Sequence, residues 1–350
     1  MNILLGTEHS RRLGWLDSLR GFAIILVLIG HIHTYLPIWL VKYIYGFHMP
    51  LFFLISGYIF NEKHFRETFS DYLKTLTIKY ISPYFVLTLI NLIIETLKMI
   101  ILKKFSWQQF IKYIWGIIIS RGTTEWMPCC SPLWFLTCMF ITMILFWMVN
   151  QWDKKWVHHI LVATFLIIGS ALYFLKIPKL PWNIDTACMA LFFVYAGYLL
   201  RKNEYRIFEH FKFEKRLFVY LLMFVIGSLA IVFNPVPNVS MDDAVYGNVV
   251  AFLIGGIMIS IVILECFKFL DNCKRNRILE NVGKKTIYIM GFDYFANTFA
   301  VKIAEAVSPN LQFLLCFIIK CAILFVGFEM LRFIIIRSPG KLRAYFYFVY

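Results

Sequence analysis

The chain has few charged residues. Asp, Glu, Lys and Arg together make up 16% of its 350 residues, and only 20 of the residues are acidic. A soluble domain is usually about one quarter charged and about half apolar, whereas 60% of this chain is hydrophobic. The shortage of charge excludes an ordinary soluble protein and predicts an all-α, polytopic membrane protein.

The sequence also lacks the patterns of other protein classes. It has no repeat of fixed period and no low-complexity linker, so we expect residues 1–350 to form a single integral-membrane domain. Its eight cysteines show no metal-site or disulfide spacing, and we expect no bound metal. The net charge of +15 could indicate a nucleic-acid partner, but the basic residues lie between apolar runs, as orientation signals do. No cleavable signal peptide is expected.

Long apolar runs are abundant instead. Crossing a hydrocarbon core takes about 20 apolar residues, which predicts about ten spans, near 21–37, 44–61, 78–102, 132–149, 157–175, 184–200, 217–234, 246–267, 286–302 and 311–336. The apolar segment 110–120 is too short to span and is expected to lie in the interface or to re-enter. Lys and Arg are about three times as frequent in the inner segments of this topology as in the outer ones, which favours both termini in the cytoplasm.

Two ionisable residues bracket the first apolar run. Arg20 begins the run RGFAIILVLIGH, and His31 ends it. On an α-helix the step from Arg20 to His31 corresponds to three turns and roughly 20°. Both side chains would therefore share one face of the helix, about 16 Å apart along its axis. With Arg20 at the membrane surface, His31 would lie near mid-membrane, where an ionisable group is costly and indicates a functional site. The alternative is a neutral histidine that is hydrogen-bonded to a neighbouring helix.

Three nearby residues have more than one interpretation. His33 would lie some 200° around the helix from His31, so we expect at most one of the two to face a site. His48 enters the second apolar run near the outer surface, where it either contributes to a site or faces lipid headgroups. Asp17 precedes Arg20 by three residues, a spacing that favours a structural pair or a cap.

Two opposite charges are expected deep in the membrane. Asp293 and Lys320 each fall near the middle of a predicted span. An unpaired charge would be expensive at that depth, so the two side chains are expected to approach each other.

Several motifs resemble one protein family. The runs WLDSLRGFAIILVLIGH and FHMPLFFLISGYIF look like the start of the acyltransferase type 3 family of integral-membrane O-acyltransferases, and more narrowly of its fucose 4-O-acetylase-related branch. Further matches follow in order along nearly the whole chain: SPYF at Ser82, PLWFL at Pro132, LPWNIDTA at Leu180, the glycine Gly197, and GKKTIYIM at Gly283.

The resemblance implies a multi-pass enzyme of the cell (inner or plasma) membrane. Such a protein moves an acyl group, usually acetyl from cytoplasmic acetyl-CoA as co-substrate, to a sugar hydroxyl of an envelope glycan or lipid-linked sugar, with no bound cofactor. His31 falls on the catalytic histidine of the family and would act as base or acyl relay, while Arg20 would serve the donor side. A positioned imidazole suits this chemistry, because a hydroxyl needs a base to attack a thioester. The residues that would bind donor or substrate are Asp17, His48, Lys79 and Trp134.

Two departures from the family pattern leave alternatives open. Members often carry Arg-x-x-Arg before the proline of the third span, where this chain has Leu76 and Lys79. Many members have a histidine after the GKKTI-like motif, where this chain has Asp293. A donor such as succinyl-CoA therefore remains compatible with the sequence.

The alternative function is a transporter or flippase of glycan intermediates without acyl chemistry.

Overall fold

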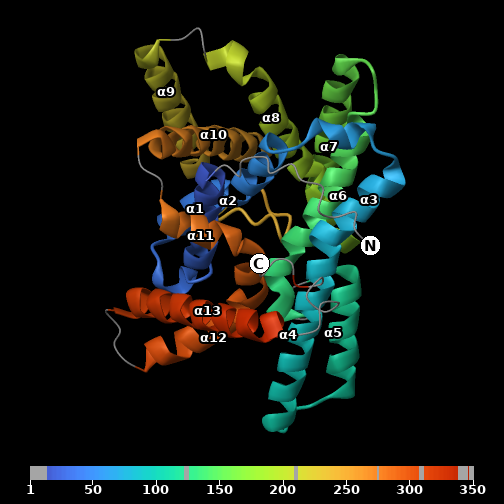
Figure 1. Cartoon of the computed structure of the whole chain (residues 1–350), viewed down its shortest axis with the longest axis vertical. Helices are drawn as coiled ribbons and strands as arrows, with labels where there is room; N and C mark the ends of the chain where they lie inside the picture. Colours follow the sequence, from blue (N-terminus) through green and yellow to red (C-terminus); the bar gives the residue numbers. More distant parts are fainter. Residues whose placement is uncertain are drawn as a thin grey trace.

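A computed structural model of the chain describes residues 14–121, 126–208, 212–273, 276–306, 311–337 and 346. Within these ranges the chain is helical and has no β-strand beyond one isolated bridge between Ser240 and Val245. The all-helical class predicted from the composition is confirmed (Figure 1).

The helices follow one another along the chain, and the connection between α9 and α10 is a long loop over residues 233–248. Their bounds are α1 Gly14–Gly30, η1 His33–Tyr35, α2 Ile38–Tyr58, η2 Glu62–Arg66, α3 Phe69–Leu76, η3 Thr77–Ile81, α4 Ser82–Ile101, α5 Trp107–Ile119, η4 Pro128–Leu133, α6 Trp134–Val149, α7 Lys155–Phe174, η5 Pro181–Asn183, α8 Ile184–Phe208, α9 Phe213–Val232, α10 Val249–Cys273, α11 Arg277–Lys284, α12 Thr286–Glu305 and α13 Gln312–Arg337. The η3 segment is a π-helical turn that joins α3 to α4.

Eight helical segments in the described ranges are long and apolar enough to cross a membrane, so the chain is a multi-pass membrane protein. They are Ile38–Tyr58, Phe69–Ile101, Cys129–Val149, Lys155–Phe174, Pro181–Asn203, Phe213–Val232, Val249–Leu270 and Gln312–Arg337. Two of the predicted spans are missing from this set. The first, α1, has only 17 residues, and the other, α12, contains three charged residues, Asp293, Lys302 and Glu305. The count of ten stays a prediction, and the two termini lie outside the described residues.

The first helix ends earlier than the sequence predicts. The prediction of a span at 21–37 is wrong, because α1 covers Gly14–Gly30 and a turn follows it directly. Accordingly, α2 begins at Ile38, six residues before the predicted start at 44. Pro50 lies inside α2, where its ring removes one backbone hydrogen bond. Hydropathy places an apolar run but does not show where the backbone turns within it.

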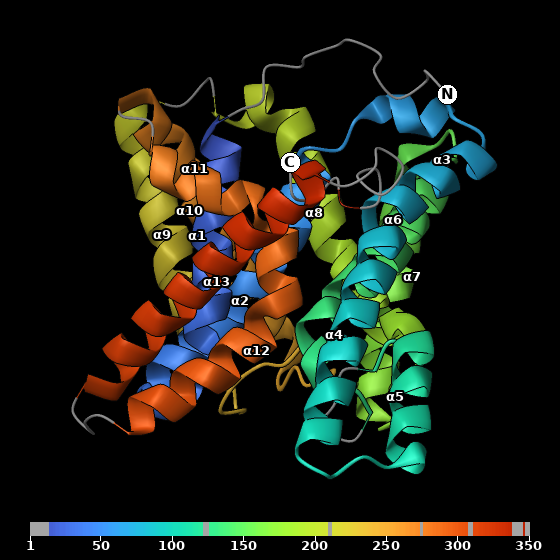
Figure 2. The same ribbon diagram turned by 60° about the horizontal axis from the view of Figure 1, so that its bottom comes forward.

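The helices form two groups that α8 connects. In one group, α2 packs against α1, α8 and α10, while α9 covers α10 and α13 covers α12. In the other group, α4 to α7 lie together on the right of Figure 2, and α8 also packs against α6 and α7. The pair α12 and α13 runs obliquely across the front of α1, and α5 lies beside the lower half of α4 (Figure 2).

Glycines bring two pairs of helices into backbone contact. Gly57 of α2 faces Gly197 of α8, and Gly21 of α1 faces Gly283 of α11. A Cβ atom added at any of these positions would lie only 1.8 or 2.0 Å from a carbonyl oxygen of the facing helix. Small residues allow such close approach in membrane proteins. These contacts hold α1 and α2, which carry the site, against the rest of the fold.

Replacing Gly197 with Ala is expected to destabilise the protein, because the new methyl group overlaps the Leu54 carbonyl oxygen, which cannot move without its helix. Overpacking of this kind typically costs about 1–3 kcal/mol. The thermal unfolding midpoint of the purified protein in detergent measures the effect. Gly169→Ala is the matched control, since its Cβ would meet only side-chain atoms, of Met189 at 3.0 Å and of Cys188 at 3.2 Å, and no backbone carbonyl. Equal midpoints for both variants would contradict the prediction.

Candidate active site

A cavity of about 310 Å³ lies where segments far apart in the sequence converge. Its walls come from the end of α1, the middle of α2, the η4–α6 junction, the loop between α9 and α10, and α12. Its lining includes three histidines, two acidic residues and several aromatic side chains. The full set of lining residues is Val27, His31, His33, Tyr45, His48, Met49, Phe52, Ser131, Pro132, Trp134, Phe135, Asn238, Val239, Ser240, Met241, Asp242, Asp243 and Met290.

His31 follows the last residue of α1 and is held by a carboxylate from α12. Its ring atom Nδ1 is hydrogen-bonded to Oδ2 of Asp293, which lies 262 positions away in the sequence. An ionised carboxylate only accepts hydrogen bonds, so Nδ1 carries the hydrogen and Nε2 is the ring nitrogen that is left for another partner. About one third of the His31 side chain is exposed, whereas Asp293 is buried. The arrangement therefore presents a ring nitrogen of fixed tautomer at the cavity.

Lys320 of α13 balances the charge of Asp293. Its Nζ atom lies 2.7 Å from Oδ1 of Asp293, and both side chains are almost completely buried. The same ammonium group donates to the Leu28 carbonyl oxygen at 3.1 Å and to Oδ1 of Asn297 at 3.3 Å. The ion pair that the sequence predicted between Asp293 and Lys320 is present, with His31 as a third member.

The other two histidines line the same cavity. His48 is buried in α2, where Nδ1 donates to the Ile44 carbonyl oxygen at 2.8 Å and leaves Nε2 as the remaining acceptor. The prediction that His31 and His33 could not both face one site is wrong, because the helix ends at Gly30 and the helical angle no longer applies. No group of three or more His, Cys, Asp or Glu side chains in the described ranges is arranged to hold a metal ion.

Three predicted site residues do not line this cavity. Arg20 lies earlier in α1, and its Nη1 atom contacts Oδ1 of Asp17 at 3.2 Å, the i,i+3 pair that their spacing indicates. Lys79 is exposed in the π-helical turn, with its ammonium group 5.1 Å from the centre of the Tyr80 ring. The structure thus brings His31, His48 and Trp134 together at the cavity and leaves Arg20, Asp17 and Lys79 outside it.

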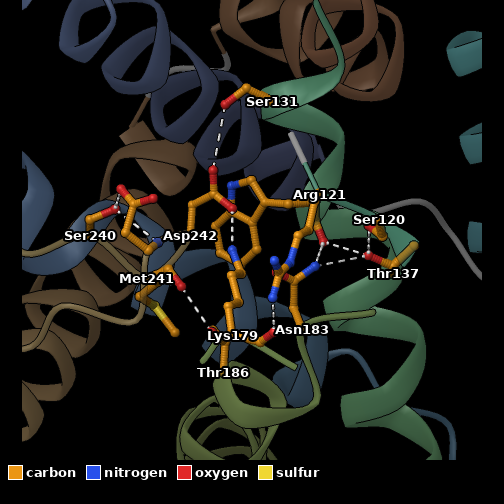
Figure 3. Close-up of polar contacts among 12 residues, drawn as sticks. Ser120, Arg121, Ser131, Thr137, Lys179, Asn183, Thr186, Ser240, Met241 and Asp242 are labelled. Atoms are coloured by element: carbon orange, nitrogen blue, oxygen red, sulfur yellow. Dashed lines mark hydrogen bonds and ion pairs between the residues drawn. The ribbon is translucent and has the colours of Figure 1, made fainter. Parts of the chain in front are cut away.

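Hydrogen bonds hold the α9–α10 loop as a wall of the cavity. Asp242 pairs with Nζ of Lys179 at 2.7 Å and accepts from the Ser131 hydroxyl at 3.5 Å, and Thr186 donates to the Met241 carbonyl oxygen at 2.9 Å (Figure 3). Burial raises the pKa of Asp242, and the positive charge of Lys179 opposes that rise. The loop is therefore attached both to η4 and to the start of α8.

The sequence did not indicate two parts of this site. It predicted Asp293 only as a partner of Lys320, although its position where family members have a histidine was a signal of a role beside His31. It also did not single out the loop residues Asp242 and Asp243, whose signal was a pair of acidic residues between two apolar runs. Neither signal specifies which distant side chain these residues meet.

Comparisons with known proteins match most of the chain. The model of a family described as an acyltransferase domain matches residues 13–328. Nodulation protein NolL of Mesorhizobium japonicum is 26% identical over 187 residues, a match that covers 51% of this chain and 46% of the relative. The chain thus spans just under half the length of this curated relative. No solved structure gives a significant match.

Proposed function

Because the chain belongs to the acyltransferase family, we propose that it is a membrane O-acetyltransferase of the cell envelope. It moves an acetyl group from cytoplasmic acetyl-CoA to a sugar hydroxyl of an envelope glycan or lipid-linked sugar, in the inner or plasma membrane. The observation that carries the proposal is the Asp293–His31 pair at the cavity, which is the geometry of an oriented general base.

The reaction uses His31 as the base. Its Nε2 takes the proton of the sugar hydroxyl while the hydroxyl oxygen bonds to the acyl carbon of the thioester. The bond between that carbon and the sulfur of coenzyme A then breaks, and the imidazolium returns the proton to the leaving thiolate. Asp293 holds the tautomer and stabilises the imidazolium that forms in between. Lys320 keeps Asp293 ionised, because a buried carboxylate needs a positive partner.

The remaining residues have roles that follow from their positions. His48 and Trp134 line the cavity beside His31 and are assigned to the acceptor. Arg20 lies three helical turns before His31, toward the end of α1 where the basic inner segments are predicted, and is assigned to the donor. With Arg20 in the first half of α1 and His31 just after its last residue, donor and acceptor approach the reacting centre from opposite sides.

Deleting the gene is expected to remove an acetyl ester from the envelope glycan while the polymer is still made and exported. Mass spectrometry of the purified glycan measures the loss of one acetyl group per modified unit, and complementation with the wild-type gene restores it. A glycan with unchanged ester content would contradict the proposal. Loss of the surface polymer altogether would point to transport instead of acyl transfer.

A further inference from the structure

A second cavity, of about 210 Å³, is lined by part of the same α9–α10 loop as the cavity at His31. Asp243 lines both cavities. Asp242 lines the first, and its ion-pair partner Lys179, to which Figure 3 shows it bonded, lines the second. This ion pair therefore lies at the boundary of the two cavities. The polar and aromatic side chains of the second cavity are Tyr173, Lys176, Lys179, Asp185, Asp243 and Tyr246.

At the second cavity, one carboxylate oxygen and one ammonium group have no hydrogen-bond or ion-pair partner among the described residues. Asp185 is only 6% exposed, and its Oδ1 atom has no hydrogen-bond partner among the described residues. Leaving such an oxygen buried and unsatisfied is costly, and the exceptions in native proteins often mark a binding role. Lys176 is exposed at the same cavity and has no ion pair in the part of the chain that the structure describes. Tyr173 and Tyr246 add two aromatic rings, packed edge to face at 5.4 Å.

The backbone just before Asp185 is held in an unusual conformation. Trp182 and Asn183 both have a φ of 58°, which side chains other than glycine rarely adopt. Their side chains are anchored, since Trp182 Nε1 donates to the Ile118 carbonyl oxygen at 2.9 Å and Asn183 Nδ2 donates to the Thr137 hydroxyl at 3.2 Å. Strain that the surroundings enforce in this way tends to occur at functional sites.

We propose that the second cavity binds a further sugar unit of the acceptor. The enzyme then acts on a glycan of at least two sugar units, with one unit at His31 and the next beyond the loop. A sugar hydroxyl donates to Oδ1 of Asp185, another accepts from Lys176, and the half-buried ring of Tyr173, supported by the buried ring of Tyr246, contacts the apolar face of the sugar. The balance of two carboxylates, Asp185 and Asp243, with two ammonium groups, Lys176 and Lys179, suits a hydroxyl-rich ligand rather than a polyanion. This inference rests on the proposed acetyl transfer to a glycan.

The test uses the purified full-length enzyme in proteoliposomes with labelled acetyl-CoA. The acceptors are mono-, di- and trisaccharide fragments of the de-esterified envelope glycan. We expect the wild-type kcat/KM for the disaccharide to exceed that for the monosaccharide by at least about tenfold. One additional charge-assisted hydrogen bond accounts for a difference of this size. Asp185→Asn and Lys176→Ala should remove most of this preference by raising KM for the disaccharide, while turnover of the monosaccharide stays unchanged.

Lys104→Ala is the matched control, because Lys104 is an exposed lysine between α4 and α5 that lines neither cavity. Lys176→Ala changes an exposed side chain, so it keeps the test valid even where Asp185→Asn folds poorly. Acetylation of all fragments with equal kcat/KM, or a full preference retained in both variants, would overturn the inference and leave the proposed function intact. Failure to acetylate fragments of any length would overturn both.

Discussion

Replacing His31 with Ala is expected to abolish glycan acylation while leaving expression and membrane insertion intact. The imidazole is the group that Asp293 orients at the cavity, so its removal takes away the base that accepts the hydroxyl proton. Loss of a general base typically lowers the rate about 10²- to 10⁴-fold. Alanine is a small apolar residue and adds no polar group that would need a partner in the membrane. The rate of acetyl transfer from labelled acetyl-CoA in membrane vesicles measures the effect.

The matched control for this prediction is His33→Ala. His33 lines the same cavity, but its ring makes no hydrogen bond within the described part of the chain, so most activity should remain. A His31→Ala protein that acylates at a near-normal rate would contradict the assignment and make His48 the next candidate. Near-complete inactivity of both variants would indicate that the cavity tolerates no change at the α1–α2 turn, and His31 would then lose its special role.

Replacing either Asp293 or Lys320 with Ala is expected to reduce the amount of folded protein. Each side chain is almost fully buried, and removing one leaves the opposite charge without its partner. Breaking a buried pair in this way typically costs about 3–5 kcal/mol. The double variant should recover part of the loss, because it leaves neither charge stranded. Size-exclusion chromatography and thermal unfolding of the detergent-purified variants measure the folded fraction, and strictly additive losses would argue against the pair.

Activity separates the two roles of Asp293. The double variant recovers folding but lacks the carboxylate that holds the His31 tautomer, so it should remain as inactive as Asp293→Ala. Asp293→Asn provides a second measurement, since the amide preserves size but can donate to Nδ1 and so favours the wrong tautomer. A double variant that regains wild-type acylation would show that Asp293 balances Lys320 and does not orient His31.

Local features of the sequence predicted part of the site. His31 stood out as an ionisable residue at the end of an apolar run, and the cost of a lone buried charge predicted the pairing of Asp293 with Lys320, whereas Arg20 lies outside the cavity. The same reasoning failed for His33, because it extended the first helix beyond Gly30. A single helix boundary thus decided whether His33 reaches the cavity together with His31.

By itself the sequence determined that this protein is an all-α membrane protein. Its many long apolar runs are stable only in a membrane, where each run must form a helix to pair its backbone polar groups. Hydropathy and charge cost are properties of each segment, so they can be read along the chain. Only the tertiary structure decided that Asp293 holds His31 and that the α9–α10 loop closes the cavity. Those contacts depend on where helices end and where they cross. The crossings in turn depend on close packing of glycines against the backbone of helices that are far apart in the sequence.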